Sequence, residues 1–130
     1  MKIYKMKGVS KFARREKITD ASLLEAVARA ERGLIDADLG GGLIKQRVAR
    51  KGQGRSGGFR LLLAYRVQEL VVFLYGFAKN ELDNITPDQL AELTEVAKSW
   101  LSASPAVIEA NIEKGTLAEI KHDEEKHDKA

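Results

Sequence analysis

Cysteine is absent from this chain of 130 residues, which excludes disulfide bonds, thiolate nucleophiles and cysteine-bound zinc. The first residues lack the apolar stretch of a secretory signal. No window approaches the about 20 consecutive apolar residues of a membrane-spanning helix. The apolar residues, 44% of the total, still suffice for one packed core. We therefore expect a soluble, cytoplasmic domain without redox chemistry.

Acidic residues are missing between positions 45 and 60, where four glycines and six basic residues occur. The basic residues are Lys45, Arg47, Arg50, Lys51, Arg55 and Arg60. Residues 1–66 carry 16 Lys and Arg against 6 Asp and Glu, a net charge of +10, whereas residues 67–130 carry 6 against 13, a net charge of −7. This asymmetry indicates a surface for a polyanion, most often a nucleic acid.

Hydrophobic periodicity predicts a strand over residues 2–7, a short helix over 9–16 and a second helix that Thr19 or Asp20 caps and Gly33 ends. Residues 36–42 are rich in turn formers. Extended runs follow over 43–49, 59–66 and 70–77, which predict three antiparallel strands, the last two joined by a tight turn at 67–69. In the third run, Val71, Phe73 and Tyr75 are expected to point to one face, and both faces are apolar.

The second half of the chain is predicted to cover the other face of the sheet. Thr86, Pro87 and Gln89 form the signature of a capped helix start, and an apolar stripe follows that should bury Trp100. A short helix over 105–114 and an edge strand over 116–121 precede a charged tail. The fold class is therefore α+β, a small, antiparallel-rich, twisted sheet with a helical hairpin on one face and a C-terminal helix on the other.

The period of two in a strand over 43–49 places Lys45 and Arg47 on one face and Gln46 on the other. Pairing with the next strand brings Arg60 near them, and Lys79 follows the last strand of the three. The glycine-rich segment lacks the Gly-Lys-Ser/Thr spacing of a P-loop and leads into a strand, so nucleoside triphosphate binding is not expected. Four cations are thus predicted to surround one pocket, with Arg50, Lys51 and Arg55 at a basic hairpin tip that follows an RNA backbone.

The predicted pocket contains neither histidine nor a pair of carboxylates, so a conventional acid–base site is not expected. A lysine among other cations can serve as a base toward a ribose 2′-hydroxyl, while arginines stabilise the charge that develops on the phosphorus. Such a reaction needs no metal and no cofactor. The same cations also suit a module that binds RNA, DNA or an acidic protein segment without turnover, and the residues alone leave both interpretations open.

Three segments together resemble the RelE/HigB-like toxins of bacterial type II toxin–antitoxin modules. They are Gly-Gly-Leu-Ile-Lys45-Gln-Arg47, the glycine-rich run from Gly52 to Arg60, and Tyr75-Gly-Phe-Ala-Lys79-Asn-Glu81. The resemblance covers roughly residues 1–102, which we expect to form the toxin domain, with residues 103–130 as a C-terminal extension. It implies a RelE-like fold, a cognate antitoxin and metal-independent cleavage of mRNA in the ribosomal A site.

Matched to the family pattern, Lys45, Arg47, Arg60 and Lys79 are the predicted catalytic residues. The resemblance is incomplete, because Asn80 stands where RelE-like members carry an arginine, and Ile85-Thr86 lies where they carry a tyrosine. The proton donor therefore stays open. Tyr75 or Tyr65 could replace it, although strand positions of this kind are more typical of core residues.

Two alternatives to a ribosome-dependent nuclease stay open. One is a ParE-like toxin that inhibits DNA gyrase without cutting RNA, and the other is an inactive module that only binds nucleic acid or the antitoxin. Arg14, Arg15 and Lys17 either extend an RNA or ribosome surface or merely solubilise a helix. His122 and His127 lie in the charged tail with a spacing that matches no metal-ligand motif, so no metal is expected.

Overall fold

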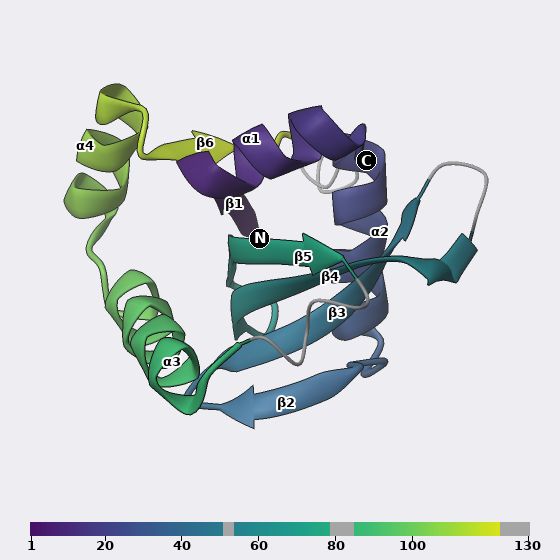
Figure 1. Cartoon of the computed structure of the whole chain (residues 1–130). Coiled ribbons are helices and arrows are strands. Elements are labelled where there is room, and N and C mark those ends of the chain that lie inside the picture. Colours follow the sequence, from purple (N-terminus) through teal and green to yellow (C-terminus); the bar gives the residue numbers. More distant parts are fainter. Residues whose placement is uncertain (51–53, 79–84, 123–130) are drawn as a thin grey trace.

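The computed structural model describes residues 1–50, 54–78 and 85–122, apart from the side chains of residue 50 and residues 54–57. The described chain forms one sheet with the strand order β2-β3-β4-β5-β1-β6, flanked by helices (Figure 1). The strands are β1 (Lys2–Met6), β2 (Ala37–Gly40), β3 (Leu43–Arg50), β4 (Gly54–Arg66), β5 (Leu70–Ala78) and β6 (Leu117–Glu119). The helices are α1 (Lys7–Glu16), α2 (Asp20–Glu31), α3 (Pro87–Leu101) and α4 (Pro105–Lys114).

The predicted antiparallel strands form the centre of the sheet, where β3 pairs with β4 and β4 with β5. The first strand of the chain lies parallel to β5, with Lys2 opposite Leu70 and Lys5 opposite Phe73. Strand β6 pairs antiparallel with the outer side of β1. The sequence predicted each of these strands but not their order, because the order depends on contacts between segments that lie far apart along the chain.

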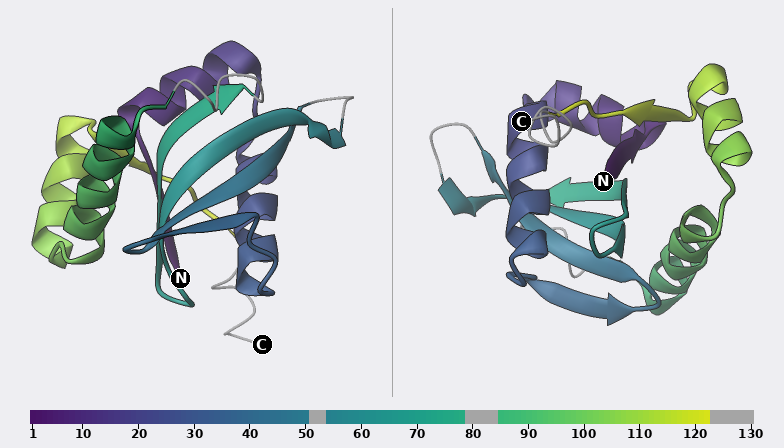
Figure 2. Two further views of the ribbon diagram at one scale, coloured as in Figure 1. Left: turned by 60° about the horizontal axis from the view of Figure 1, so that its bottom comes forward. Right: turned by 180° about the vertical axis from the view of Figure 1, so that it is seen from behind.

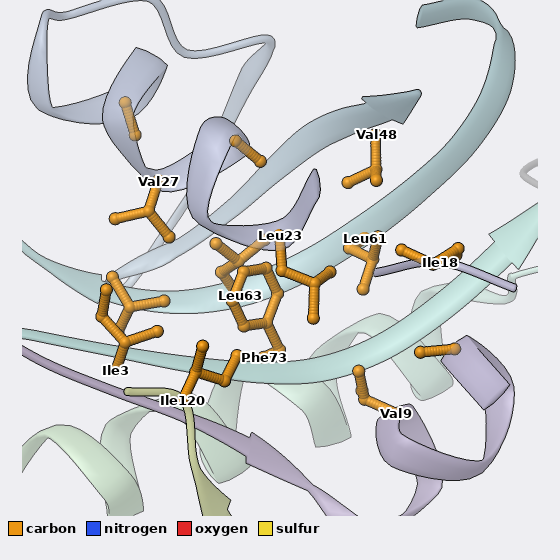
Figure 3. Packing of buried hydrophobic residues seen from close by; sticks show 14 of the residues in the cluster. Ile3, Val9, Ile18, Leu23, Val27, Val48, Leu61, Leu63, Phe73 and Ile120 are labelled. Carbon is orange, nitrogen blue, oxygen red and sulfur yellow. The ribbon is translucent and has the colours of Figure 1, made fainter. Parts of the chain in front are cut away.

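Two hydrophobic cores lie on opposite faces of the sheet. The first core contains Val9 of α1, Leu23 and Val27 of α2, and Leu63 and Phe73 of the central strands (Figure 3). The second contains Ala97 and Trp100 of α3 and Ile108 of α4. Figure 2 shows α3 and α4 on one side of the sheet and α2 on the other. The predicted α+β class with helices on both faces is therefore confirmed.

The helix starts agree with the capping signals. The side chain of Thr19 accepts a hydrogen bond from the Ser22 N–H at 3.1 Å, so Thr19 rather than Asp20 is the N-cap. Thr86 and Gln89 form a complete capping box, with hydrogen bonds of 2.9 and 3.1 Å. Gly115 ends α4 in the left-handed conformation, as predicted for a C-terminal glycine.

Residues 36–42 are more ordered than their turn-rich composition predicted. Residues Ala37 to Gly40 form β2, which pairs antiparallel with the start of β3. Gly41 and Gly42 close a tight hairpin with positive φ angles of 64° and 84°, a backbone conformation that residues with a side chain adopt with difficulty. The turn prediction was thus right for the glycines and wrong for the residues before them, because a polar edge strand shows little hydrophobic periodicity.

A β-bulge in β5 reverses one predicted side-chain direction. Leu62 pairs with Tyr75, but Leu63 pairs with Phe73, so Leu74 is an additional residue in β5. Val71 and Phe73 pack in the first core as expected, whereas Tyr75 lies opposite Leu62 of the second core and is 45% exposed. The prediction that Tyr75 shares a face with Val71 and Phe73 is therefore wrong.

The segment after α3 packs into both cores. Ile108 of α4 and Leu117 of β6 are buried in the second core, and Ile120 is fully buried in the first. The predicted boundary at residue 102 stays a prediction. None of the helices in the described ranges has the length and apolar character that a membrane span requires.

Candidate functional site

Three of the four predicted catalytic cations lie in two adjacent rows across the sheet. Lys45 of β3 pairs with Leu62 of β4, and two residues further on, Arg47 pairs with Arg60. Paired residues of antiparallel strands project to the same face, and so do residues two positions apart in one strand. Lys45, Arg47 and Arg60 therefore share one face of the sheet, as the sequence predicted.

This face is the one that α3 covers in part. Leu62 pairs with Lys45, and Phe77 pairs with Arg60. Both belong to the second core together with Trp100 of α3. The C-terminal half of α3 packs close to the β2–β3 turn, because a Cβ atom at Gly42 would lie 2.4 Å from a methyl group of Leu101. The three cations thus lie on the same face as α3, along the strands that lead away from this turn.

Arg60 is the most unusual of the three cations. Only 7% of its surface is exposed, and within the described residues its Nη1 atom has no hydrogen-bond partner. Burial and the nearby positive charge of Arg47 lower the pKa of Arg60 from its usual value, an effect that Asp36 partly offsets. Burial of a guanidinium with an unpaired N–H donor costs free energy, and an anionic ligand that accepts a hydrogen bond from this donor would relieve the cost.

Ion pairs around the buried side chain of Arg29 fix the strand that carries Lys45 and Arg47. Arg29 of α2, only 3% exposed, contacts Glu25 through Nε at 2.9 Å and Asp36 through Nη1 at 3.7 Å, and Nη2 donates to the backbone carbonyl of Arg47. Asp36 accepts a hydrogen bond from the backbone N–H of Arg47 and lies 3.8 Å from its Nε. The side chains of Arg29 and Asp36 thus make hydrogen bonds with the carbonyl and the N–H of Arg47. Arg47 lies just beyond Lys45, the last residue of β3 that pairs with β2.

Gln46 holds the opposite face of the same strand. It is fully buried, and its amide donates to the backbone carbonyls of Ala26 and Leu34 and accepts from the N–H of Asp36. The amide therefore ties β3 to α2 and to the segment before β2. The prediction that Gln46 and Lys45 point to opposite faces is confirmed by these contacts.

The two tyrosines considered as proton donors have different surroundings. Tyr65 is buried, and its hydroxyl donates a hydrogen bond to Glu31. Burial and this bond raise the pKa of Tyr65 above its usual value, as expected of a structural core residue. Tyr75 is exposed, and its ring centroid lies 6.0 Å from that of Phe77, the partner of Arg60. The core interpretation therefore holds for Tyr65 and is wrong for Tyr75.

Several predicted site residues fall outside what the structure describes. Lys79 and Lys51 lie in ranges without a described placement, as does His127, and nothing is described of the side chains of Arg50 and Arg55. These assignments stay predictions. His122 contacts the backbone carbonyl of Met1 at 3.0 Å. The described ranges contain no group of three or more His, Cys, Asp or Glu side chains that could hold a metal ion.

Sequence reasoning missed three residues around the site, Arg29, Asp36 and Lys11. Arg29 occurs among alanines in an amphipathic helix, where a cation usually faces solvent, and only the structure shows that its exposed fraction is 3%. Asp36 is 11 positions before Arg47, and no local pattern links the two. Lys11 lines a hollow with Tyr75 and Gly76 of β5 that only the packing of α1 creates.

Comparison with protein families gives one match. The chain matches the family described as RelE toxin of the RelE/RelB toxin–antitoxin system over residues 1–120. The matched range includes the strands β1 to β6, the helices α1 to α4 and the three clustered cations of the described chain. A comparison with curated proteins finds no match.

Proposed function

Because the chain belongs to the RelE toxin family, it is the toxin of a toxin–antitoxin pair, and we propose that it acts as a metal-independent endoribonuclease that cuts mRNA on the ribosome. The resemblance already noted in the sequence extends this proposal to the ribosomal A site and to a cognate antitoxin as the inhibiting partner. The cytoplasm is then the place of action. The observation that carries the proposal is the buried guanidinium of Arg60 opposite Arg47, with an Nη1 atom free of hydrogen-bond partners in the described chain.

The reaction requires three tasks from the site. The 2′-hydroxyl of a ribose loses its proton and attacks the adjacent phosphorus, a 2′,3′-cyclic phosphate forms, and the bond to the 5′-oxygen of the next nucleotide breaks as that oxygen gains a proton. In our proposal Lys45 accepts the first proton. Arg60 and Arg47 bind the non-bridging oxygens, on which negative charge grows in the transition state.

Tyr75 supplies the proton to the leaving oxygen in this scheme. It pairs with Leu62, which itself pairs with Lys45, so the tyrosine lies in the same row and on the same face as the proposed base. It is also diagonal to Arg60, whose partner is Phe77. The phosphate would then bind between Lys45 on β3 and Tyr75 on β5, over the strand that carries Arg60.

A reconstituted translation reaction tests the proposal. Purified protein is added to reporter mRNA with and without ribosomes, and primer extension maps the RNA ends. We expect cuts only with ribosomes, and their loss in Lys45→Ala and in Arg60→Met, which keeps the volume of the buried side chain. Lys98→Ala is the matched control, because Lys98 is an exposed cation of α3 that pairs with Glu95.

Growth arrest in cells adds the second measurement. Full toxicity of both site variants would contradict the assignment of Lys45 and Arg60. Intact mRNA in both translation reactions, together with growth arrest and a DNA-damage response, would instead support inhibition of a topoisomerase.

A further inference from the structure

A second feature lies beside the proposed active site, a groove between α1 and the C-terminal half of β5. Its lining includes Gly8, Lys11 and Arg15 of α1 and Tyr75 and Gly76 of β5. We propose that this groove binds the single-stranded RNA next to the cleaved phosphate, with Lys11 and Arg15 on phosphate groups and the ring of Tyr75 against a base. The choice of RNA as ligand rests on the proposed function.

The groove exists because β1 is shorter than β5. The pairing of the two strands ends at Lys5 and Phe73, so in the described chain no strand neighbours that side of β5 beyond the bulge. Helix α1 lies there instead (Figure 1). It approaches closely because residue 76 is glycine, where a Cβ atom would lie 2.6 Å from the ring of Phe12.

The α1 wall of the groove is positively charged. Lys11 and Arg15 are exposed and four residues apart, which places them on one side of the helix. Lys11 has no ion-pair partner among the described residues. The Nε atom of Arg15 contacts Glu16 at 3.0 Å, and the guanidinium lies 5.4 Å from the centre of the Phe12 ring, which holds it at the groove. Two exposed cations one helical turn apart suit ionic contacts to an RNA backbone.

Tyr75 connects this groove to the proposed active site. This residue is 45% exposed, lines the groove and also lies in the row of Lys45 and Leu62. Aromatic side chains beside a basic groove are typical of single-strand binding, since every base has a face that can stack on a ring. The phosphates of a single strand would use the cations and its bases the exposed ring, so the arrangement matches RNA in both of its parts.

Gly8 offers a way to block the groove without disturbing the fold. A Cβ atom at Gly8 meets nothing within 4 Å, and the residue lies in the first turn of α1, where no acidic residue is present. A glutamate there interacts favourably with the helix dipole. Gly8→Glu should therefore keep or raise the melting temperature while it repels RNA, and Gly8→Gln, of nearly equal size, isolates the effect of the charge.

Binding is measured by fluorescence anisotropy with a labelled RNA of about ten nucleotides, in which 2′-O-methyl groups prevent cleavage. We expect Gly8→Glu to bind several-fold more weakly than Gly8→Gln. The double variant Lys11→Ala/Arg15→Ala should reduce the slope of log K against log salt by about 1.4, the value for two phosphate contacts to a single strand. Tyr75→Ala should weaken binding about tenfold, whereas Tyr75→Phe should not. Lys114→Ala on α4 controls for a change in net charge.

The outcomes separate the groove from the nuclease. If the groove variants lose RNA affinity while the wild-type protein fails to cut mRNA in translation, the result supports RNA binding in the groove and contradicts the proposed nuclease function. Equal affinities and salt slopes for wild type, Gly8→Glu and the double variant, or no binding of the oligonucleotide by any of them, would overturn the groove proposal. So would displacement of the bound RNA by a polyglutamate peptide at lower concentration than unlabelled RNA, because the groove would then suit an acidic protein segment.

Discussion

Asp36 shows how a single residue orders the cations of the site. Its carboxylate contacts the guanidinium groups of both Arg29 and Arg47, and it also accepts a hydrogen bond from the backbone N–H of Arg47. Its negative charge acts to raise the pKa of Arg60, and so offsets part of the lowering that burial and the charge of Arg47 cause. Asp36 therefore acts as a positioning residue, since the cation of the proposed substrate site that it contacts is Arg47.

Replacing Asp36 by Asn should separate cleavage from binding. The variant leaves buried Arg29 with a weaker partner, so we expect a loss of about 1–3 kcal/mol in the free energy of unfolding. Cleavage should fall because Arg47 is no longer held, whereas affinity for the uncleavable RNA should stay equal or rise with the added positive charge. Urea unfolding, primer extension and anisotropy measure the three quantities.

Asp38→Asn is the control for this change, because Asp38 is exposed and bonds only to the N–H of Gly40 among the described contacts. Equal cleavage by the Asp36 variant and the wild type would contradict a positioning role.

Tyr65 gives a residue-scale prediction about pH. The raised pKa of Tyr65 means that the folded protein favours the protonated phenol, so its stabilising effect is present below the usual pKa of 10.0 and is lost as the pH rises above it. At neutral pH, Tyr65→Phe should lower the free energy of unfolding by about 1–3 kcal/mol, since a hydrogen bond to the Glu31 carboxylate is lost.

The measurement is urea unfolding of both proteins from neutral pH to above pH 10. The difference between wild type and variant should shrink as the pH passes 10. A constant difference across this range would show that the Tyr65 hydroxyl contributes no pH-linked stability.

At the scale of elements, the contact between α1 and β5 determines the groove. Most elements were predictable, because their signals are local: the capping box at Thr86, the proline at the start of α4 and the alternation in β3 each depend on a few neighbouring residues. The bulge at Leu74 was not predictable, because it depends on the register between β4 and β5. It is nevertheless the feature that exposes Tyr75.

Gly76→Ala tests this helix–strand contact. The added methyl group would lie 2.6 Å from the Phe12 ring, which is buried against Phe59 with ring centroids 5.4 Å apart. We expect a loss of about 1–3 kcal/mol in the free energy of unfolding, as is usual for an overpacked core. Gly8→Ala is the matched control, since its methyl group meets open space and should stabilise α1 by up to about 1 kcal/mol. Equal melting temperatures of the two variants would contradict the close contact.

At the scale of the whole molecule, the first and last strands of the described chain lie side by side in the sheet. Strand β6 pairs with β1, and the N–H of Ile120 donates to the carbonyl of Ile3 at 2.8 Å. Figure 2 shows this C-terminal strand along the edge formed by the N-terminal one. The acidic second half of the sequence thus includes segments that complete the fold of the basic first half.

Truncation tests where the stable unit ends. A chain that stops at residue 102 loses Ile108, Leu117 and Ile120 from the two cores. We expect it to lose cooperative thermal unfolding, because three buried aliphatic side chains contribute several kcal/mol together. A chain that stops at His122 keeps all three and should melt like the full protein. Cooperative unfolding of the shorter chain at the same temperature would support the predicted boundary at residue 102.

The sequence by itself determined most of the elements, the two apolar faces of the sheet and the shared face of Lys45 and Arg47, because capping, periodicity and strand alternation act between near neighbours. Tertiary structure alone decided the parallel place of β1, the burial of Arg29 and Arg60, the exposure of Tyr75 and the groove beside it. These features depend on strand register and on which helix covers which strand. Both are settled by contacts between distant segments, whose strength no single stretch of sequence reveals.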